Sequence, residues 1–138
     1  MFLNVSLGYR LKILKGNKFL FTLSQYSPGY GEAFETFIFH ELSTYLHYQN
    51  RAETLNFWRT STGFEVDFII GEKIAIEVKS TKLVDNKDLK GLKAIAQERA
   101  FRRFIIISKE PNRRQIDQFE IWPYRSFLQA LWNHDIVQ

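Results

Sequence analysis

The fold is decided by residues 65–80, whose sequence is Glu-Val-Asp-Phe-Ile-Ile-Gly-Glu-Lys-Ile-Ala-Ile-Glu-Val-Lys-Ser. Two runs with every second residue apolar flank the turn formers Gly71-Glu72-Lys73, and such alternation predicts a β-hairpin with strands over 64–70 and 74–80. A loop of three residues keeps opposed residues on one face of the pair. One face should then carry Val66, Phe68, Ile70, Ile74, Ile76 and Val78, and the other Glu65, Asp67, Ile69, Ala75, Glu77 and Lys79.

The sequence around this hairpin predicts helices and further strands. Apolar residues at helical spacing indicate a helix over 31–48, and residues 55–60 are strand-like. Asp85 should cap a helix that runs to about residue 100, and the apolar run 104–108 should be a buried strand parallel to 74–80. A short strand over 119–122 and a helix that opens at Pro123 should complete the chain.

The order αβββαβ therefore predicts an α/β fold with a central mixed sheet flanked by helices. The strand that carries Glu77 should lie in the interior of this sheet, because it leads into the crossover helix. We expect one domain over 1–138, with a peripheral N-terminal hairpin within 1–30 (residues 10–23 about Gly16-Asn17), the core over 31–109 and a C-terminal extension over 110–138.

Composition restricts the class of protein. The 138 residues are 45% hydrophobic and 16% aromatic, which is typical of one globular domain with a packed core. The chain has no cysteine, so disulfides, thiolate zinc sites, iron–sulfur clusters and cysteine nucleophiles are excluded, and a cytoplasmic location is expected. No apolar run approaches the roughly 20 residues that span a bilayer, so no membrane association is expected.

Positive charge is concentrated in one part of the chain. The net charge is +4, yet the window 87–114 holds nine basic and three acidic residues (9 − 3 = +6), which leaves −2 for the rest. Lys87, Lys90 and Lys93 repeat at helical spacing and are followed by Arg102 and Arg103. They indicate contacts with a nucleic-acid backbone, or a solvated helix face. Arg59, before Thr60, is a further candidate phosphate contact, or a surface arginine beside a packed tryptophan.

The polar face of the hairpin suggests a metal site. The expected register places Asp67 opposite Glu77 and Glu65 opposite Lys79, with Cβ atoms about 5 Å apart in each pair. Two carboxylates so close need a proton or a cation between them, and Mg²⁺ accepts one or two carboxylates together with water and phosphate oxygens. Lys79 could then orient a water molecule or stabilise charge on a phosphate. The other interpretation is an ordinary solvated hairpin face.

Glu35 is a third acid that could reach this site. It lies in line with Ile38, Leu42 and Leu46, so it shares a helix face with apolar residues. A carboxylate in that position either interacts with the first turn of its own helix or points into a site, and helix physics alone leaves both open.

These residues match a known pattern. Glu35, Asp67 and Glu77-Val78-Lys79 resemble the signature of the PD-(D/E)XK nuclease superfamily, with valine in place of the proline of its name. Four blocks in order, over 31–36, 57–60, 65–68 and 77–80, resemble the domain of unknown function that ends many prokaryotic AAA+ ATPases. The resemblance covers residues 31–109.

The resemblance implies a restriction-endonuclease-like fold and a DNA phosphodiesterase site that uses Mg²⁺ or Mn²⁺. Asp67 and Glu77 would be metal ligands, Glu35 a ligand directly or through water, and Lys79 the residue that positions the attacking water. The alternative is a catalytically inactive module that binds DNA or an ATPase partner, and a third interpretation is an interaction module with an exposed aromatic patch. Because no GxxxxGK[ST] loop occurs, we expect a fragment, a stand-alone relative or a decayed copy without the ATPase domain.

Overall fold

The computed structural model describes residues 2–4 and 29–138. The hairpin expected over 10–23 lies outside the described residues. The elements are β1 (Phe2–Asn4), α2 (Tyr30–Tyr48), β2 (Leu55–Arg59), β3 (Glu65–Ile70), β4 (Ile74–Val78), α3 (Lys90–Glu98), β5 (Arg103–Ser108), β6 (Arg114–Ile116), β7 (Phe119–Pro123) and α4 (Tyr124–Trp132).

The strands form one mixed sheet in the order β1-β2-β3-β4-β5-β7-β6. β4, β5 and β7 pair in parallel, while the remaining neighbours are antiparallel. The expected mixed α/β fold is confirmed, and β4 lies in the interior as predicted. β1 and β6 are short strands that the sequence pattern did not predict.

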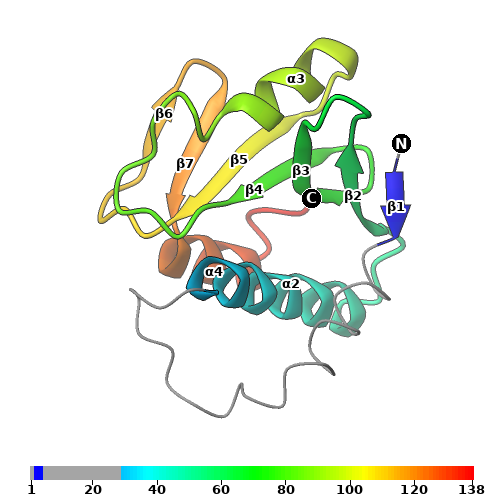
Figure 1. The fold of residues 1–138 in the computed structure, drawn as a ribbon. Helices are drawn as coiled ribbons and strands as arrows, with labels where there is room; N and C mark the ends of the chain where they lie inside the picture. Colours follow the sequence, from blue (N-terminus) through cyan, green and yellow to red (C-terminus); the bar gives the residue numbers. More distant parts are fainter. Residues whose placement is uncertain (1, 5–28) are drawn as a thin grey trace.

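Helices cover both faces of the sheet (Figure 1). α2 and α4 share one core with Phe68, Ile76 and Ile105 from the central strands. α3 covers the other face and packs on Ile69, Ala75 and Ile106. Successive strand residues point to opposite faces, so the apolar runs of β4 and β5 supply both cores.

The hairpin β3–β4 has the expected register over part of its length. The pairs Phe68↔Ile76, Ile69↔Ala75 and Ile70↔Ile74 are those that a three-residue turn requires. The pairing of β3 with β2 shifts by one residue between Asn56 and Trp58, which places an extra residue in β3. Because of this bulge, residues of β3 before it point to the opposite face from the one that simple alternation with Phe68 and Ile70 predicts. Val66 therefore packs with the α3 core and not beside Phe68, so its expected face was wrong.

The helix expected from Asp85 begins later, at Lys90. The Oδ1 atom of Asp85 accepts the N–H of Lys87 at 2.7 Å, and the Oδ2 atom of Asp88 accepts the N–H of Asp85 at 2.9 Å. These bonds stabilise tight turns that precede α3, so the aspartate caps a turn and not the α-helix. The physical reason is that short polar side chains offer the backbone partners outside the helix.

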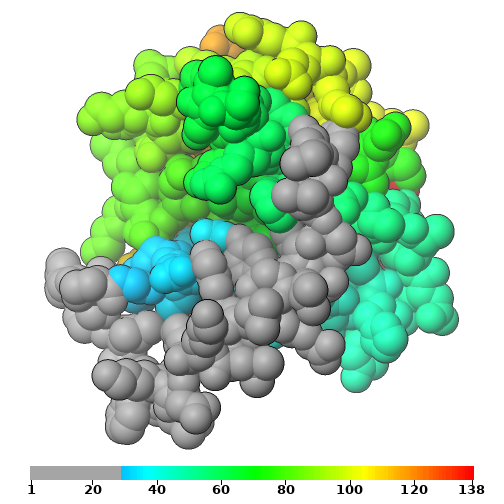
Figure 2. All heavy atoms as spheres, turned by 45° about the vertical axis from the view of Figure 1, so that its right-hand side comes forward, coloured from blue at the N-terminus to red at the C-terminus, as the bar shows by residue number. Residues whose placement is uncertain are grey.

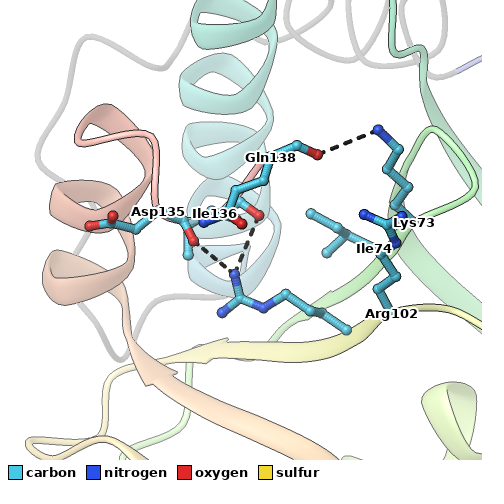
Figure 3. Close-up of a pocket in the computed structure, with 7 residues that line it drawn as sticks. Lys73, Ile74, Arg102, Asp135, Ile136 and Gln138 are labelled. Carbon is cyan, nitrogen blue, oxygen red and sulfur yellow. Dashed lines mark hydrogen bonds between the residues drawn. The ribbon is translucent and has the colours of Figure 1, made fainter.

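The C-terminal residues complete the core under α2. Ile136 and Val137 are buried, and basic side chains bind the carbonyl oxygens of this segment. Lys73 donates to Gln138 at 3.4 Å, and Arg103 donates to Asp135 at 3.1 Å (Figure 3). Among the described residues, no helix combines the length and apolar character needed to cross a bilayer.

Candidate active site

Four charged side chains from three elements meet at the carboxyl end of β4. Glu77 lies in β4 and Lys79 follows it, while Asp67 occupies the bulge of β3. α2 brings Glu35 to the same place, because its first turn lies against this end of β4. A Cβ atom on Gly31 would be 3.4 Å from the Oγ atom of Ser80.

The bulge gives Asp67 a particular role. Its Oδ2 atom accepts the backbone N–H of Val78 at 2.7 Å. The backbone pairing of β3 with β4 extends only to Phe68 and Ile76, so beyond that pair the Asp67 side chain takes the place of a backbone acceptor. The sequence placed Asp67 directly opposite Glu77. In the structure the Asp67 carboxylate instead reaches across to the residue after Glu77, which still brings the two acids together.

Glu77 is buried and incompletely bonded. It is 4% exposed, and its Oε1 atom lies 2.6 Å from the Nζ atom of Lys79. Its Oε2 atom is buried and has no hydrogen-bond partner among the described residues. A buried carboxylate oxygen without a donor is unfavourable for folding. This atom is therefore suited to accept a proton or a cation.

The electrostatics of the site favour the same conclusion. Burial and the charge of Asp67 raise the pKa of Glu77 to about 8. Burial, followed by the charges of Asp67 and Glu65, raises the pKa of Glu35 to about 8. Burial alone would lower the pKa of Lys79. The charge and hydrogen bond of Glu77 have a larger effect in the opposite direction, so the pKa of Lys79 is raised. The site thus holds three carboxyl groups and one lysine. The single positive charge does not offset three negative charges, so Glu35 and Glu77 bind protons more tightly than ordinary glutamates do.

A groove of about 250 Å³ opens from the site toward the start of α3. Glu77 and Lys79 form one side, and the rest of the lining includes two lysines, Lys87 and Lys90, and two acids, Glu65 and Asp88. The groove depends on Gly91, because a Cβ atom there would lie 2.0 Å from the carbonyl oxygen of Glu65. The sequence analysis missed this residue, although a glycine inside a helical pattern is a signal of close packing.

The other basic residues expected to contact nucleic acid are dispersed. Arg59 lies at the rim of the groove, where it pairs with the lining residue Glu65 at 3.1 Å, whereas Lys93 donates to Asn86 at 3.2 Å. Arg102 and Arg103 lie at the opposite end of the strands, since Arg103 pairs with Ile74 at the start of β4.

Arg103 is bound within the protein. Its guanidinium donates two bonds of 2.8 Å to Glu120, besides those to the C-terminal carbonyl oxygens (Figure 3). We therefore assign Arg103 a structural role and keep Lys87 and Lys90 as the basic residues beside the site.

The donor set is compatible with a hard divalent cation. Asp67 and Glu77 provide two carboxylates, one with an unbonded buried oxygen, and Mg²⁺ commonly binds one or two carboxylates and keeps several waters. Within residues 2–4 and 29–138, no three His, Asp or Glu side chains are gathered closely enough to hold a metal among themselves. Glu35 therefore does not form one ligand set with Asp67 and Glu77.

Comparison with known proteins gives a family and no function. Searches of curated proteins and of solved structures find no match. The family model "Domain of unknown function (DUF4143)" matches residues 30–127, which include the whole site and most of both cores. The chain therefore belongs to the DUF4143 family of domains of unknown function.

Proposed function

We propose that this domain is a Mg²⁺-dependent DNA phosphodiesterase of the PD-(D/E)XK type. The observation that carries the proposal is Glu77, a buried carboxylate of a central strand with one oxygen unbonded. It interacts with Lys79 and Asp67 and lines a groove to which Lys87 and Lys90 also contribute. A strained charge cluster in a groove is typical of functional sites.

Each residue has a distinct part in the proposed reaction. Asp67 and Glu77 would hold Mg²⁺, and Glu35 would bind a water molecule of its hydration shell. The bound ion would supply a Lewis acid for the phosphodiester. Lys79 is held by Glu77 and is 36% exposed, so its ammonium group can orient the attacking water or contact a phosphate oxygen. Lys87 and Lys90 would bind the DNA backbone beside the site.

The test is cleavage of plasmid and single-stranded DNA in the presence of Mg²⁺ or Mn²⁺. Wild type should cleave at least one substrate, and Lys79→Ala and Glu77→Gln should lower the rate about 100-fold or more, the scale seen when one electrostatic catalytic group is removed. Lys82→Ala and Glu98→Gln are matched exposed controls outside the groove and should retain the wild-type rate. If wild type and Lys79→Ala are equally inert on every substrate, the enzyme proposal is wrong.

A second candidate is an inactive relative that binds DNA or an ATPase partner. The observation in its favour is that Lys79 already neutralises one oxygen of Glu77 at 2.6 Å without a metal. This alternative requires salt-sensitive DNA binding that needs no divalent ion and survives Glu77→Ala. Binding isotherms at increasing salt, with Mg²⁺ and with EDTA, separate it from the enzyme.

A further inference from the structure

An aromatic groove lies on the other side of the first turns of α2. Its lining residues are Tyr30, Ala33, Phe34 and Phe37 of α2 and Tyr124 of α4, and its volume is about 320 Å³. We call this set the aromatic groove. The volume is within the range of small-ligand sites. The core described above leaves these rings partly uncovered, and Phe37 is 41% exposed.

The rings are arranged as a rigid platform. Phe34 is only 8% exposed and forms the floor. Tyr30 is parallel to Phe34 with ring centroids 6.5 Å apart, and Tyr124 meets Phe34 edge to face at 5.5 Å. Aromatic pairs of these geometries are favourable and fix the ring planes. The groove thus presents preformed aromatic surface to a planar ligand.

Two cations border the aromatic groove. The Nζ atom of Lys109 lies 4.7 Å from the ring centre of Tyr30. The guanidinium of Arg125 lies 5.6 Å from the ring centre of Tyr124, and its Nε atom donates to the hydroxyl of Tyr124 at 2.9 Å. The first turn of α2 adds one acid, Glu32. The two cations give the groove a positive border that complements an anionic ligand.

The aromatic groove and the candidate active site share their supporting elements. α2 carries Glu35 toward the site and Tyr30 toward the groove. The segment after β5 is tied to the segment after β4, because Lys109 donates its backbone N–H to Thr81 at 2.9 Å. Lys79 and Lys109 thus follow neighbouring parallel strands at the same end of the sheet. The ends of β4 and β5 lie near the starts of α2 and α4 (Figure 1). Figure 2 shows the start of α2, in blue, at the surface beside the yellow-green residues that follow β4.

We propose that the aromatic groove binds single-stranded DNA next to the candidate active site, with a base stacked on Phe37. Lys109 and Arg125, which lie over the rings of Tyr30 and Tyr124, would hold the backbone, and these two rings would complete the apolar walls around the bases. Proteins bind unpaired strands by combining aromatic platforms with positive charge, and stacking needs base faces that a duplex hides. The inference rests on the proposed function for the choice of DNA as substrate. It adds that the preferred substrate is a single strand.

Binding without cleavage tests the groove. Fluorescence anisotropy of a fluorescein-labelled oligothymidylate, in EDTA, should show that Phe37→Ala and Tyr124→Ala each weaken binding about 5- to 100-fold, the scale of one lost base–aromatic stack. Binding of a duplex of equal length should stay unchanged. Phe37→Tyr keeps a ring that can stack and should bind the single strand more tightly than Phe37→Ala does. Tyr48→Ala, which removes a 73% exposed ring near the other end of α2, is the matched control and should have no effect.

The outcomes separate the groove from the nuclease. Ring-dependent binding without any cleavage would support the aromatic groove and reject the enzyme, whereas cleavage with unchanged affinity of the ring variants would do the reverse. No binding of the single strand by wild type, or equal losses for single strand and duplex, would overturn the groove. A wild-type dimer that Phe37→Ala dissociates would also overturn the proposal, because the aromatic groove would then be occupied by a second copy of the protein. If Tyr124→Ala does not fold, the half-exposed Phe37 still decides the matter.

Discussion

Two glutamates of nearly equal burial behave in opposite ways in this fold. Glu77 is 4% exposed and Glu110, which follows β5, is 6% exposed. Both Glu110 oxygens are bonded: Oε1 accepts the N–H of Val84 at 2.6 Å and both oxygens accept guanidinium donors of Arg114 at 2.8 Å. The hydrogen bonds of Arg114 hold the pKa of Glu110 below its ordinary value, whereas burial raises that of Glu77.

The difference distinguishes a carboxylate that stabilises the fold from one available for chemistry. Glu110 and Arg114 tie the loop before α3 to the end of β5, and Arg114 also donates to the carbonyl oxygen of Val84 at 2.7 Å. Glu77, in contrast, has the Lys79 ammonium group at Oε1, no hydrogen-bond partner at Oε2 among the described residues, and a second acid, Asp67, beside it. Proteins satisfy nearly all buried polar groups, so an exception in a groove is the feature on which the proposed metal site rests.

The largest effect should come from packing at the site end of the sheet. Gly91→Ala places a methyl group 2.0 Å from the Glu65 carbonyl oxygen, so α3 must move away from β3. We expect a loss of about 3 kcal/mol in the free energy of unfolding, measured with urea. Gly31→Ala, whose nearest contact would be 3.4 Å, is the matched helical control and should change stability by less than about 1 kcal/mol. Equal losses for the two variants would show that the close contact of α3 with β3 at Gly91 is not important for stability.

The two glutamates themselves give the next largest difference. Glu110→Gln leaves an amide NH₂ group that cannot accept a bond and removes the charge that Arg114 needs, so we expect a loss of about 2 kcal/mol. Glu77→Gln replaces a carboxyl group that its raised pKa keeps mostly protonated with a neutral amide, so it should change stability by less than about 1 kcal/mol at pH 7. Urea unfolding of both variants measures the difference. A Glu77→Gln loss as large as that of Glu110→Gln would make Glu77 a structural residue.

The sequence was sufficient for the sheet core because its signals are local. Alternation in 65–80, the three-residue turn and the helical spacing in 31–48 predicted β3, β4, α2 and the interior place of β4. Glu35, Asp67, Glu77 and Lys79 were named from the sequence and lie together in the structure. They meet because α2, β3 and β4, which carry them, come together at the same end of the sheet.

What the sequence could not predict depends on contacts between distant elements. The bulge at Asp67 arises in the pairing with β2, so alternation within 65–70 misplaced Val66. Glu110 looked like any surface acid, because its partners Val84 and Arg114 are separated from one another by 30 residues. Arg103 looked like a member of a basic surface until Glu120, on a neighbouring strand, was seen to bind it. Charge patterns in sequence cannot show which charges are paired.

The pH dependence of stability should separate the two glutamates further. A carboxyl whose folded pKa is near 8 binds a proton more tightly in the folded state than in the unfolded state, so stability falls as pH rises from about 4.5 toward 8. We expect Glu77 to contribute a loss of about 1 kcal/mol between pH 6 and 7 in the metal-free protein in EDTA, and Glu35, whose pKa is also raised, to add to that loss. Glu77→Gln should reduce this slope. Glu110, with its lowered pKa, contributes stability that is lost only under acidic conditions, and Glu110→Gln should keep the slope.

Stabilisation by Mg²⁺ itself should be an effect of similar size. An ion that binds the folded state at ten times its dissociation constant adds about 1.4 kcal/mol, seen as a rise in melting temperature. The gain should increase from pH 6 to 8, because protons compete for the Glu77 carboxylate and are released as its pKa is passed. Glu110→Gln should retain the gain and Glu77→Gln should lose it. Equal gains in both variants would place the ion elsewhere, and the unbonded Glu77 oxygen would then be a cost to the fold without the proposed use.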